Sequence, residues 1–212
     1  MKKIGCIALS VLLCVILLTS CAAAGKLSDA EIAQLRVQFP LKDAEVVETG
    51  DSSDENAMNS FQSIKNNQLQ NAICVAKVTL KSVDSFSATE KVGDGYPDEK
   101  FNRVYWTVHV DEVITKKTGE TLADDVILYV GTQERYGNLL DLPTGIQMVV
   151  SITSVPDGVD FPEQKKFYGC PSMISYYVTD DNHILAIYDL PGSKEMDGKT
   201  LDAFRQEVKN VF

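Results

Sequence analysis

Hydrophobic and polar positions change their spacing along the chain, and each change predicts a different kind of element. Ser28 and Glu31 have the spacing of a capping box, which predicts that a short helix begins after residue 28. This helix is expected to end near Pro40, because proline cannot continue a helix. A second helical pattern follows at Met58, Phe61, Ile64 and Leu69. The N-terminal part of the chain therefore predicts two helices.

From residue 72 the period falls to two, which is the spacing of strands. The segment 104–111 is the clearest case, since apolar and polar residues alternate from Val104 onward. Residues 179–182 favour a hairpin turn between the last two strands. The predicted strands are 72–80, 104–111, 126–130, 146–152, 173–178 and 183–188. Long loops are expected at 84–102, 131–144 and 155–171.

Thr200 is placed to cap a C-terminal helix, whose apolar stripe is Leu201, Phe204, Val208 and Val211. The predicted fold is therefore mainly β, of the α+β class, with about six antiparallel strands. Exposed strand edges invite pairing with other chains, so a small OB-like barrel or a curled sheet is expected. The N-terminal helices and the C-terminal helix would then cover this sheet.

The N-terminus is basic and then apolar. Lys2 and Lys3 precede an apolar run over residues 4–18, which has the length of a signal-peptide core. The run is shorter than the ~20 apolar residues of a membrane-spanning helix. Leu18-Thr19-Ser20-Cys21 follows, and it resembles the lipobox of bacterial lipoproteins. An uncleaved anchor helix and an ordinary signal peptide cut at another position are the alternatives.

This resemblance implies that residues 1–20 are removed and that Cys21 carries diacylglycerol and further acyl chains such as palmitate. Two or three acyl chains anchor a protein stably to a membrane. The protein would then be extracytoplasmic and lipid-anchored in the cell membrane or the outer membrane. The expected organisation is a signal peptide over 1–20, a lipidated tether with a short helix and an acidic linker over 21–57, and one globular domain over 58–212.

Composition and charge exclude other classes of protein. The chain has 212 residues, of which 44% are apolar and 24% charged, as is typical of one globular domain. Its formal charge is −10, and loss of the two positive charges of Lys2 and Lys3 would bring it to −12. An acidic chain repels phosphate backbones, so nucleic acid is not an expected partner. The same charge would hold the domain away from an anionic membrane surface.

Two of the five cysteines, Cys6 and Cys14, lie in the predicted signal peptide. Cys21 is the predicted lipidation site, which leaves Cys74 and Cys170. An oxidising compartment permits a disulfide between them, and the long loop it closes would stabilise the fold by ~4–5 kcal/mol in the chain-entropy model. Cys74 also fits a small core residue within an apolar strand. The sequence therefore leaves open a Cys74–Cys170 disulfide and two unpaired thiols.

The sequence contains no recognisable catalytic or metal-binding motif. The two histidines are His109 and His183, and neither lies in an H-E-x-x-H sequence. Gly169-Cys170-Pro171-Ser172 lacks the second glycine of G-x-S-x-G. The loop acids do not follow the spacing of a calcium-binding loop. No catalytic residue, metal ligand or cofactor is therefore predicted.

Aromatic residues are the candidate ligand-binding positions. Tyr105 and Tyr129 fall on strand faces opposite the expected core, and Phe167 lies in an expected loop. Exposed aromatic rings on a barrel can bind peptide or sugar, and plain packing beneath the helices is the alternative. The candidate set comprises Tyr105, Tyr129, Tyr136, Tyr168 and Tyr176.

The pattern over residues 72–190 is similar to that of OB-like secreted barrels, among them netrin-type and metalloprotease-inhibitor-type domains. The likeness rests on an apolar strand at 73–78, a long alternating strand at 105–113, and short strands at 126–130 and 148–152. We therefore expect a non-catalytic, lipid-anchored module that binds an envelope protein or another ligand. An envelope hydrolase with a non-local active site is the first alternative, and a solute-binding component is the second.

Overall fold

The computed structural model describes residues 25–42, 60–90, 99–132, 140–155, 166–170, 174–209 and 211. The predicted signal peptide, the predicted lipidation site Cys21 and the candidate Tyr136 lie outside these residues. Within the described part of the chain, no helix has both the length and the apolar character that crossing a membrane would require.

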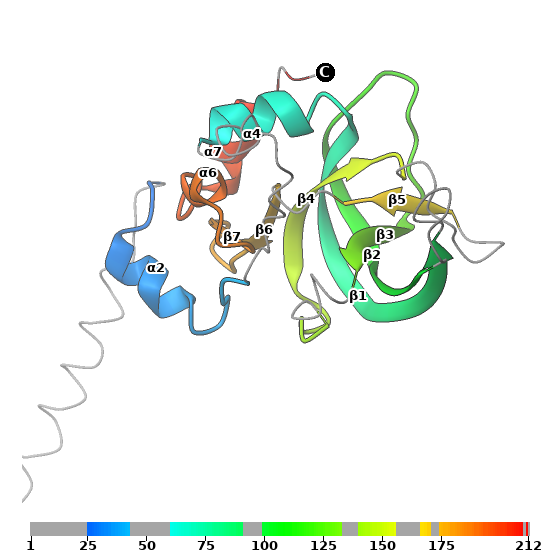
Figure 1. The fold of residues 1–212 in the computed structure, drawn as a ribbon. Coiled ribbons are helices and arrows are strands. Elements are labelled where there is room, and N and C mark those ends of the chain that lie inside the picture. The colour runs from blue at the N-terminus through cyan, green and yellow to red at the C-terminus, as the bar shows by residue number, and fades with distance from the viewer. Residues whose placement is uncertain are drawn as a thin grey trace, which may run out of the picture.

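One seven-stranded sheet forms the centre of the molecule (Figure 1). Its strands are β1 (Ala72–Glu90), β2 (Glu99–Lys116), β3 (Asp125–Thr132), β4 (Gln147–Thr153), β5 (Phe167–Gly169), β6 (Ser175–Val178) and β7 (Ile184–Ala186). The described helices are α2 (Asp29–Leu35), α4 (Phe61–Gln68), α6 (Pro191–Lys194) and α7 (Leu201–Val208). The fold is mainly β, as the sequence predicts.

The strand pairings run in a circuit from β1 through β2, β3, β5 and β4 back to β1. The β3–β5 pairing is parallel, and the other pairings are antiparallel. Contact between β4 and β5 is limited to the pair Thr153 and Gly169. A Cβ at Gly169 would lie 2.9 Å from the Ser154 carbonyl oxygen, so glycine permits this close approach. The sheet is therefore curled and partly closed, one of the two arrangements expected, and is not a regular barrel.

The β1–β2 hairpin is longer than the sequence pattern predicts, and the loop expected at 84–102 is wrong for residues 84–90 and 99–102, which are strand; residues 91–98 lie outside the described part of the chain. Cross-strand pairs continue from Ser82 and Thr107 to Glu90 and Glu99. This part of the hairpin carries many polar side chains, yet its backbone groups pair as in any ladder. A pattern of apolar residues reports burial, so it misses strands that continue beyond the core.

The other differences concern short elements. β5 lies in the expected loop at 155–171, and its three residues are too few to show a period of two. The helix α6 was not predicted either, and it spans four residues that begin with Pro191. The capping interactions follow the prediction, because Ser28 and Glu31 form a complete capping box and Thr200 accepts a hydrogen bond from the Ala203 backbone N.

Two hydrophobic cores lie on the two faces of the sheet. The inner core fills the curled sheet and includes Trp106, Leu128 and Met148. The second core lies between the sheet and the helices α4 and α7, and it includes Phe61 and Phe204. Strands that separate the two cores are buried on both faces, which is why all four residues of β6 are buried.

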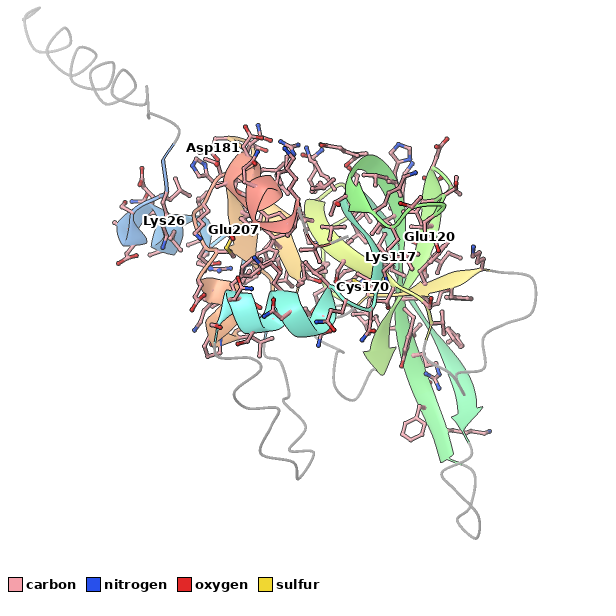
Figure 2. The ribbon with its side chains drawn as sticks, turned by 90° about the horizontal axis from the view of Figure 1, so that it is seen from above. Lys26, Lys117, Glu120, Cys170, Asp181 and Glu207 are labelled. Atoms are coloured by element: carbon pink, nitrogen blue, oxygen red, sulfur yellow. The ribbon has the colours of Figure 1, made fainter. Side chains whose placement is uncertain are left out.

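The N-terminal segment 25–42, which contains α2, packs against the β7 end of the sheet. Phe39 is buried in the inner core, and its ring lies 5.4 Å from that of Tyr177. In Figure 1, α2 lies at the end of the molecule opposite β2, β3 and β5. Figure 2 shows the same separation, with Lys26 and Asp181 at one end and Lys117 and Glu120 at the other. The molecule therefore has an N-terminal end and a β2–β3 end.

Candidate functional site

The β2–β3 end carries a group of aromatic residues on the outer surface of the sheet, here called the outer aromatic face. Tyr105 of β2 and Tyr129 of β3 are direct cross-strand partners. Their neighbours Trp106 and Leu128 point into the inner core, so the two tyrosines point outward. The complete face consists of Phe86, Arg103, Tyr105, Tyr129 and Phe167.

A β-bulge places Phe86 on this face. Leu80 points into the inner core, and strict alternation would turn Phe86 inward as well. The register between β1 and β2 shifts between Leu80 and Ser82, which inserts one extra residue. After the shift Val83 points inward and Phe86 stands opposite Arg103 on the outer surface. The bulge therefore builds the face, and no feature of the sequence alone revealed it.

Three rings of the face pack against one another. The ring centroids of Phe86 and Tyr105 are 5.6 Å apart, and those of Phe86 and Phe167 are 5.8 Å apart. Tyr105 meets Phe167 edge-on, at 5.7 Å and 87°. These distances are favourable for aromatic pairs. Phe167 is buried, whereas Phe86 and Tyr105 are half-buried, so two of the three rings keep an accessible side.

Arg103 supplies the positive charge of this face from a buried position. Its side chain is only 1% exposed, its Nη1 donates a hydrogen bond to the Tyr129 hydroxyl at 2.9 Å, and its Cζ lies 5.2 Å from the centre of the Tyr129 ring. Such a contact holds both side chains in a defined orientation. The Tyr129 ring therefore lies over a fixed cation. Because Tyr129 is only half-buried, the ring also reaches the surface.

Tyr105 keeps its hydroxyl proton over a wide pH range. Burial raises the pKa of Tyr105, and the negative charge of Asp84 on the neighbouring strand raises it further. The neutral phenol can both donate and accept a hydrogen bond. The face therefore offers apolar ring surface, a phenol hydroxyl and an underlying cation, which together suit binding of a ligand with apolar and polar groups.

The remaining candidate aromatics belong to the interior, which corrects two sequence-based expectations. Tyr176 is fully buried in the second core, where its ring lies 5.4 Å from that of Phe204. Tyr168 points into the inner core and is 8% exposed, with the Lys166 Nζ atom 4.8 Å from its ring centre. Both were expected near a loop, but α7 covers one and the curl of the sheet encloses the other.

Cys74 and Cys170 are free thiols in the structure, and both are buried. Of the two alternatives that the sequence left open, the structure has the unpaired one. Burial raises the pKa of each thiol to about 12. A thiolate is the reactive form of cysteine, so neither side chain is prepared to act as a nucleophile at neutral pH.

The histidine rings are engaged with acidic and backbone groups. His109 lies 2.9 Å from Asp125 Oδ1 at the surface of β2 and β3. His183 lies 2.9 Å from the Gly25 carbonyl oxygen and 3.1 Å from Asp181 Oδ2. Among the residues that the structure describes, no group of three or more histidine, cysteine or acidic side chains is placed to hold a metal ion.

Two concave sites lie elsewhere on the described surface. A polar groove of about 440 Å³ runs between α4 and α7, and its lining is Gln62, Lys65, Asn66, Gln70, Gln206, Glu207 and Val211. A smaller apolar pocket of about 120 Å³ lies beside Cys74, and its lining also includes Ile73, Val113, Lys116, Glu120, Thr121 and Leu122. Neither one contains a histidine or a pair of carboxylates.

Comparison with known proteins leaves the chain without an assigned family. No protein-family model matches the sequence, and no curated protein matches it either. The functional interpretation therefore rests on the residues and their geometry.

Proposed function

We propose that the protein is a lipid-anchored, extracytoplasmic binding module of the bacterial cell envelope, without catalytic activity of its own. The proposal joins two features, the lipobox-like Leu18-Thr19-Ser20-Cys21 and the outer aromatic face. Lipid on Cys21 would be the membrane anchor, and the face would contact an envelope protein or another ligand.

The position of the outer aromatic face is the observation that carries this proposal. In OB folds, which are partly open five-stranded barrels, the face of strands two and three is a common ligand-binding surface. Tyr105 and Tyr129 lie on the corresponding surface of β2 and β3. Half-buried aromatic side chains with a polar group are also the residues that dominate binding surfaces.

The arrangement of the two ends supports display of this face away from a membrane. The segment 25–42 follows closely after Cys21 in the chain, and it lies at the end opposite β2 and β3 (Figure 1). A lipid on Cys21 would therefore attach the molecule by its N-terminal end. The charge of −12 expected after removal of Lys2 and Lys3 would add repulsion from an anionic bilayer.

Site-specific crosslinking in cells tests the proposal. A photo-reactive amino acid would replace Tyr105 in one variant and the exposed Gln206 of α7 in a matched control. Each would be made with Cys21 intact and with Cys21→Ala. We expect one defined envelope component to crosslink at position 105 of the anchored protein and not at position 206.

Two results would contradict the proposal. Equal crosslinking at positions 105 and 206 would exclude the outer aromatic face as the binding surface. Lipid anchoring at this cysteine would be excluded if the Cys21→Ala protein kept its membrane fraction and differed from the wild type in mass only by the substitution itself. Turnover of an envelope substrate by the purified protein would instead support the hydrolase alternative.

A further inference from the structure

The far part of the β1–β2 hairpin has a strand edge that the rest of the sheet leaves open. The ladder between β1 and β4 ends at Thr79, whereas the ladder between β1 and β2 continues to Glu90. Leu80 still forms backbone hydrogen bonds with the segment that precedes β4. Among the described residues, no strand pairs with that side of residues 82–90, here called the free edge of β1. Figure 2 shows this part of the hairpin projecting from the rest of the sheet.

The edge beyond β7 is different, because the chain covers it with its own N-terminal segment. The backbone N of Lys42 donates to the Ile187 carbonyl oxygen at 2.7 Å, and the Asp189 N donates to the Lys42 carbonyl oxygen at 3.0 Å. An open strand edge is a template for pairing with another chain. The sheet therefore has one edge that is already occupied and one that can accept a further strand.

The free edge of β1 presents a regular row of backbone groups. The shift between Leu80 and Ser82 is the last irregularity of the ladder with β2, and the pairs then continue without a shift to Glu90 and Glu99. Successive residues of a strand turn their N–H and C=O groups to opposite sides, so every second residue of the free edge directs both groups away from β2. The segment 82–90 contains no proline that would interrupt this row. Such a row binds the backbone of another extended segment.

The side chains beside this edge continue the outer aromatic face. Asp84 is opposite Tyr105 and Phe86 is opposite Arg103. Phe86 is half-buried, and its ring lies 5.6 Å from that of Tyr105. Asp84 is exposed, and its Oδ2 accepts a hydrogen bond from the Ser82 hydroxyl at 2.8 Å. A neutral hydroxyl does not compensate the charge of this carboxylate, so Asp84 can still pair with a cation.

We propose that the free edge of β1 binds an extended polypeptide segment by adding it to the sheet as a further strand. This inference rests on the proposed function, and it names a peptide strand as the partner of the outer aromatic face. The residue opposite Phe86 would be β-branched or aromatic and the residue opposite Asp84 would be lysine or arginine, because such cross-strand pairs are favourable. These two residues lie two positions apart in the partner, whichever direction it runs.

The charge of the molecule favours a basic segment of another protein over a second copy of this chain. The formal charge of the chain is −10, and two such molecules repel each other. A segment that carries lysine or arginine is attracted by the same charge. The backbone row selects an extended partner, and the charge selects a basic one.

Binding of a designed peptide to the full chain, purified in detergent, tests the proposal. The probe is a labelled peptide of about nine residues, in which threonine alternates with valine and lysine in turn. Fluorescence anisotropy measures its affinity, and hydrogen exchange locates it. We expect binding together with slower exchange of alternate backbone amides between residues 82 and 90, because only an added strand would accept hydrogen bonds from the groups that point away from β2.

Methylation of backbone nitrogens in the peptide separates strand addition from other ways of binding. Two versions carry N-methyl groups at one or the other set of alternate residues. The version that blocks the N–H groups facing β1 should bind about tenfold more weakly, and the other should bind nearly as well as the parent peptide.

Three results would overturn the proposal. The first is equal affinity of the two methylated peptides, and the second is absence of binding at about 1 mM peptide. The third is protection of the amides between residues 82 and 90 that rises with protein concentration in the absence of peptide, since a second copy would then occupy the edge.

An exchange of charges tests the pairing with Asp84. Asp84→Lys should weaken binding of the lysine peptide about fivefold and should strengthen binding of a peptide that carries glutamate in place of lysine. Asp180→Lys is the matched control, because Asp180 is exposed in the turn before β7 and the net charge changes by the same amount. Equal effects of the two variants would contradict a cross-strand pair at Asp84.

Failure of this inference and failure of the proposed function are distinguishable. Peptide binding to the purified chain requires no lipid on Cys21, and crosslinking from position 105 in cells does not require that the partner be a strand. A defined crosslink at position 105 without protection of residues 82–90 by the peptide would refute strand addition and leave the proposed function in place.

Discussion

The two ends of the sheet use the same residue types in different ways. At the β6–β7 end, Tyr176 is enclosed by the second core and Tyr177 by the inner core, so β6 is buried on both faces. At the β2–β3 end, Trp106 is buried and its neighbour Tyr105 is half-buried. The two ends differ in what covers their strands. Helices and the N-terminal segment 25–42 cover the β6–β7 end, whereas the outer surface of the β2–β3 end keeps accessible rings. Tyrosines at the first end therefore contribute to the core, and those at the second keep part of their rings at the surface.

The largest expected effect comes from truncating one tyrosine at each end. Tyr176→Ala removes a fully buried ring from beside Phe204 and should lower the free energy of unfolding by ~4 kcal/mol. Tyr105→Ala removes a half-buried ring and should cost ~1 kcal/mol. Denaturant unfolding measures both changes, and equal losses would remove the distinction between the two ends.

The next effect compares two aspartates that contact cations. Asp197→Ala leaves the Arg36 side chain and the Ala186 N–H without their carboxylate partner and should cost ~3 kcal/mol. Asp125→Ala breaks an exposed pair with His109 and should cost under ~1 kcal/mol. Thermal unfolding of the two variants measures the stability that each one loses relative to the wild type. A smaller loss in Asp197→Ala than in Asp125→Ala would show that the docking of the N-terminal segment 25–42 through Arg36 contributes little to stability.

Two glycines with positive φ angles give a third comparison. Gly198 has φ +73°, and an added Cβ would meet both the Ile32 Cδ1 and the Leu27 Cβ at 2.9 Å. Gly198→Ala should therefore cost ~2 kcal/mol, because it combines backbone strain with a clash against the N-terminal segment 25–42.

Gly119, in the β2–β3 connection, is the matched control. It has φ +89°, and an added Cβ would have no atom within 4 Å. Gly119→Ala should cost only the ~1 kcal/mol of the left-handed conformation. Equal losses in the two variants, measured by urea unfolding, would show that the N-terminal segment 25–42 does not pack on Gly198 in solution.

The smallest effect appears only at alkaline pH. Burial raises the pKa of Cys170 from 9.0 to about 12. In the folded protein the thiol therefore keeps its proton at pH values at which the unfolded chain has already lost it. The stability that this thiol contributes is full below its unfolded pKa and declines as the pH rises toward the folded value. Cys170→Ala should reduce the loss of stability at about pH 10 by ~1 kcal/mol relative to the wild type. A pH profile of unfolding checks this, and parallel profiles would contradict the assigned burial.

Much of the fold could be predicted because local rules decide it. The alternation that begins at Val104 correctly separated the buried side of β2 from its outer side, and Tyr105 and Tyr129 lie on the outer side as expected. The capping residues Ser28 and Thr200 also act where predicted. Each of these features depends on neighbours within a few residues.

The candidate site was only partly predictable. Tyr105 and Tyr129 were named from the pattern, but Phe86 and Arg103 were missed. Phe86 reaches the outer surface through a bulge, and the buried Arg103 follows the polar Asn102, with no apolar pattern to indicate burial. A charged residue on the outer side of a strand is ordinarily exposed, so only the packed structure could place this one.

By itself the sequence determined which residues alternate along each strand, where helices α2 and α7 are capped, and that the chain is acidic with a basic and then apolar N-terminus. The tertiary structure decided that Tyr176 is core and Tyr105 is surface, that Cys74 and Cys170 are buried thiols, and that residues 25–42 dock beside β7. The physical reason is that periodicity distinguishes the two sides of a strand. What covers each side depends on segments far away in the chain.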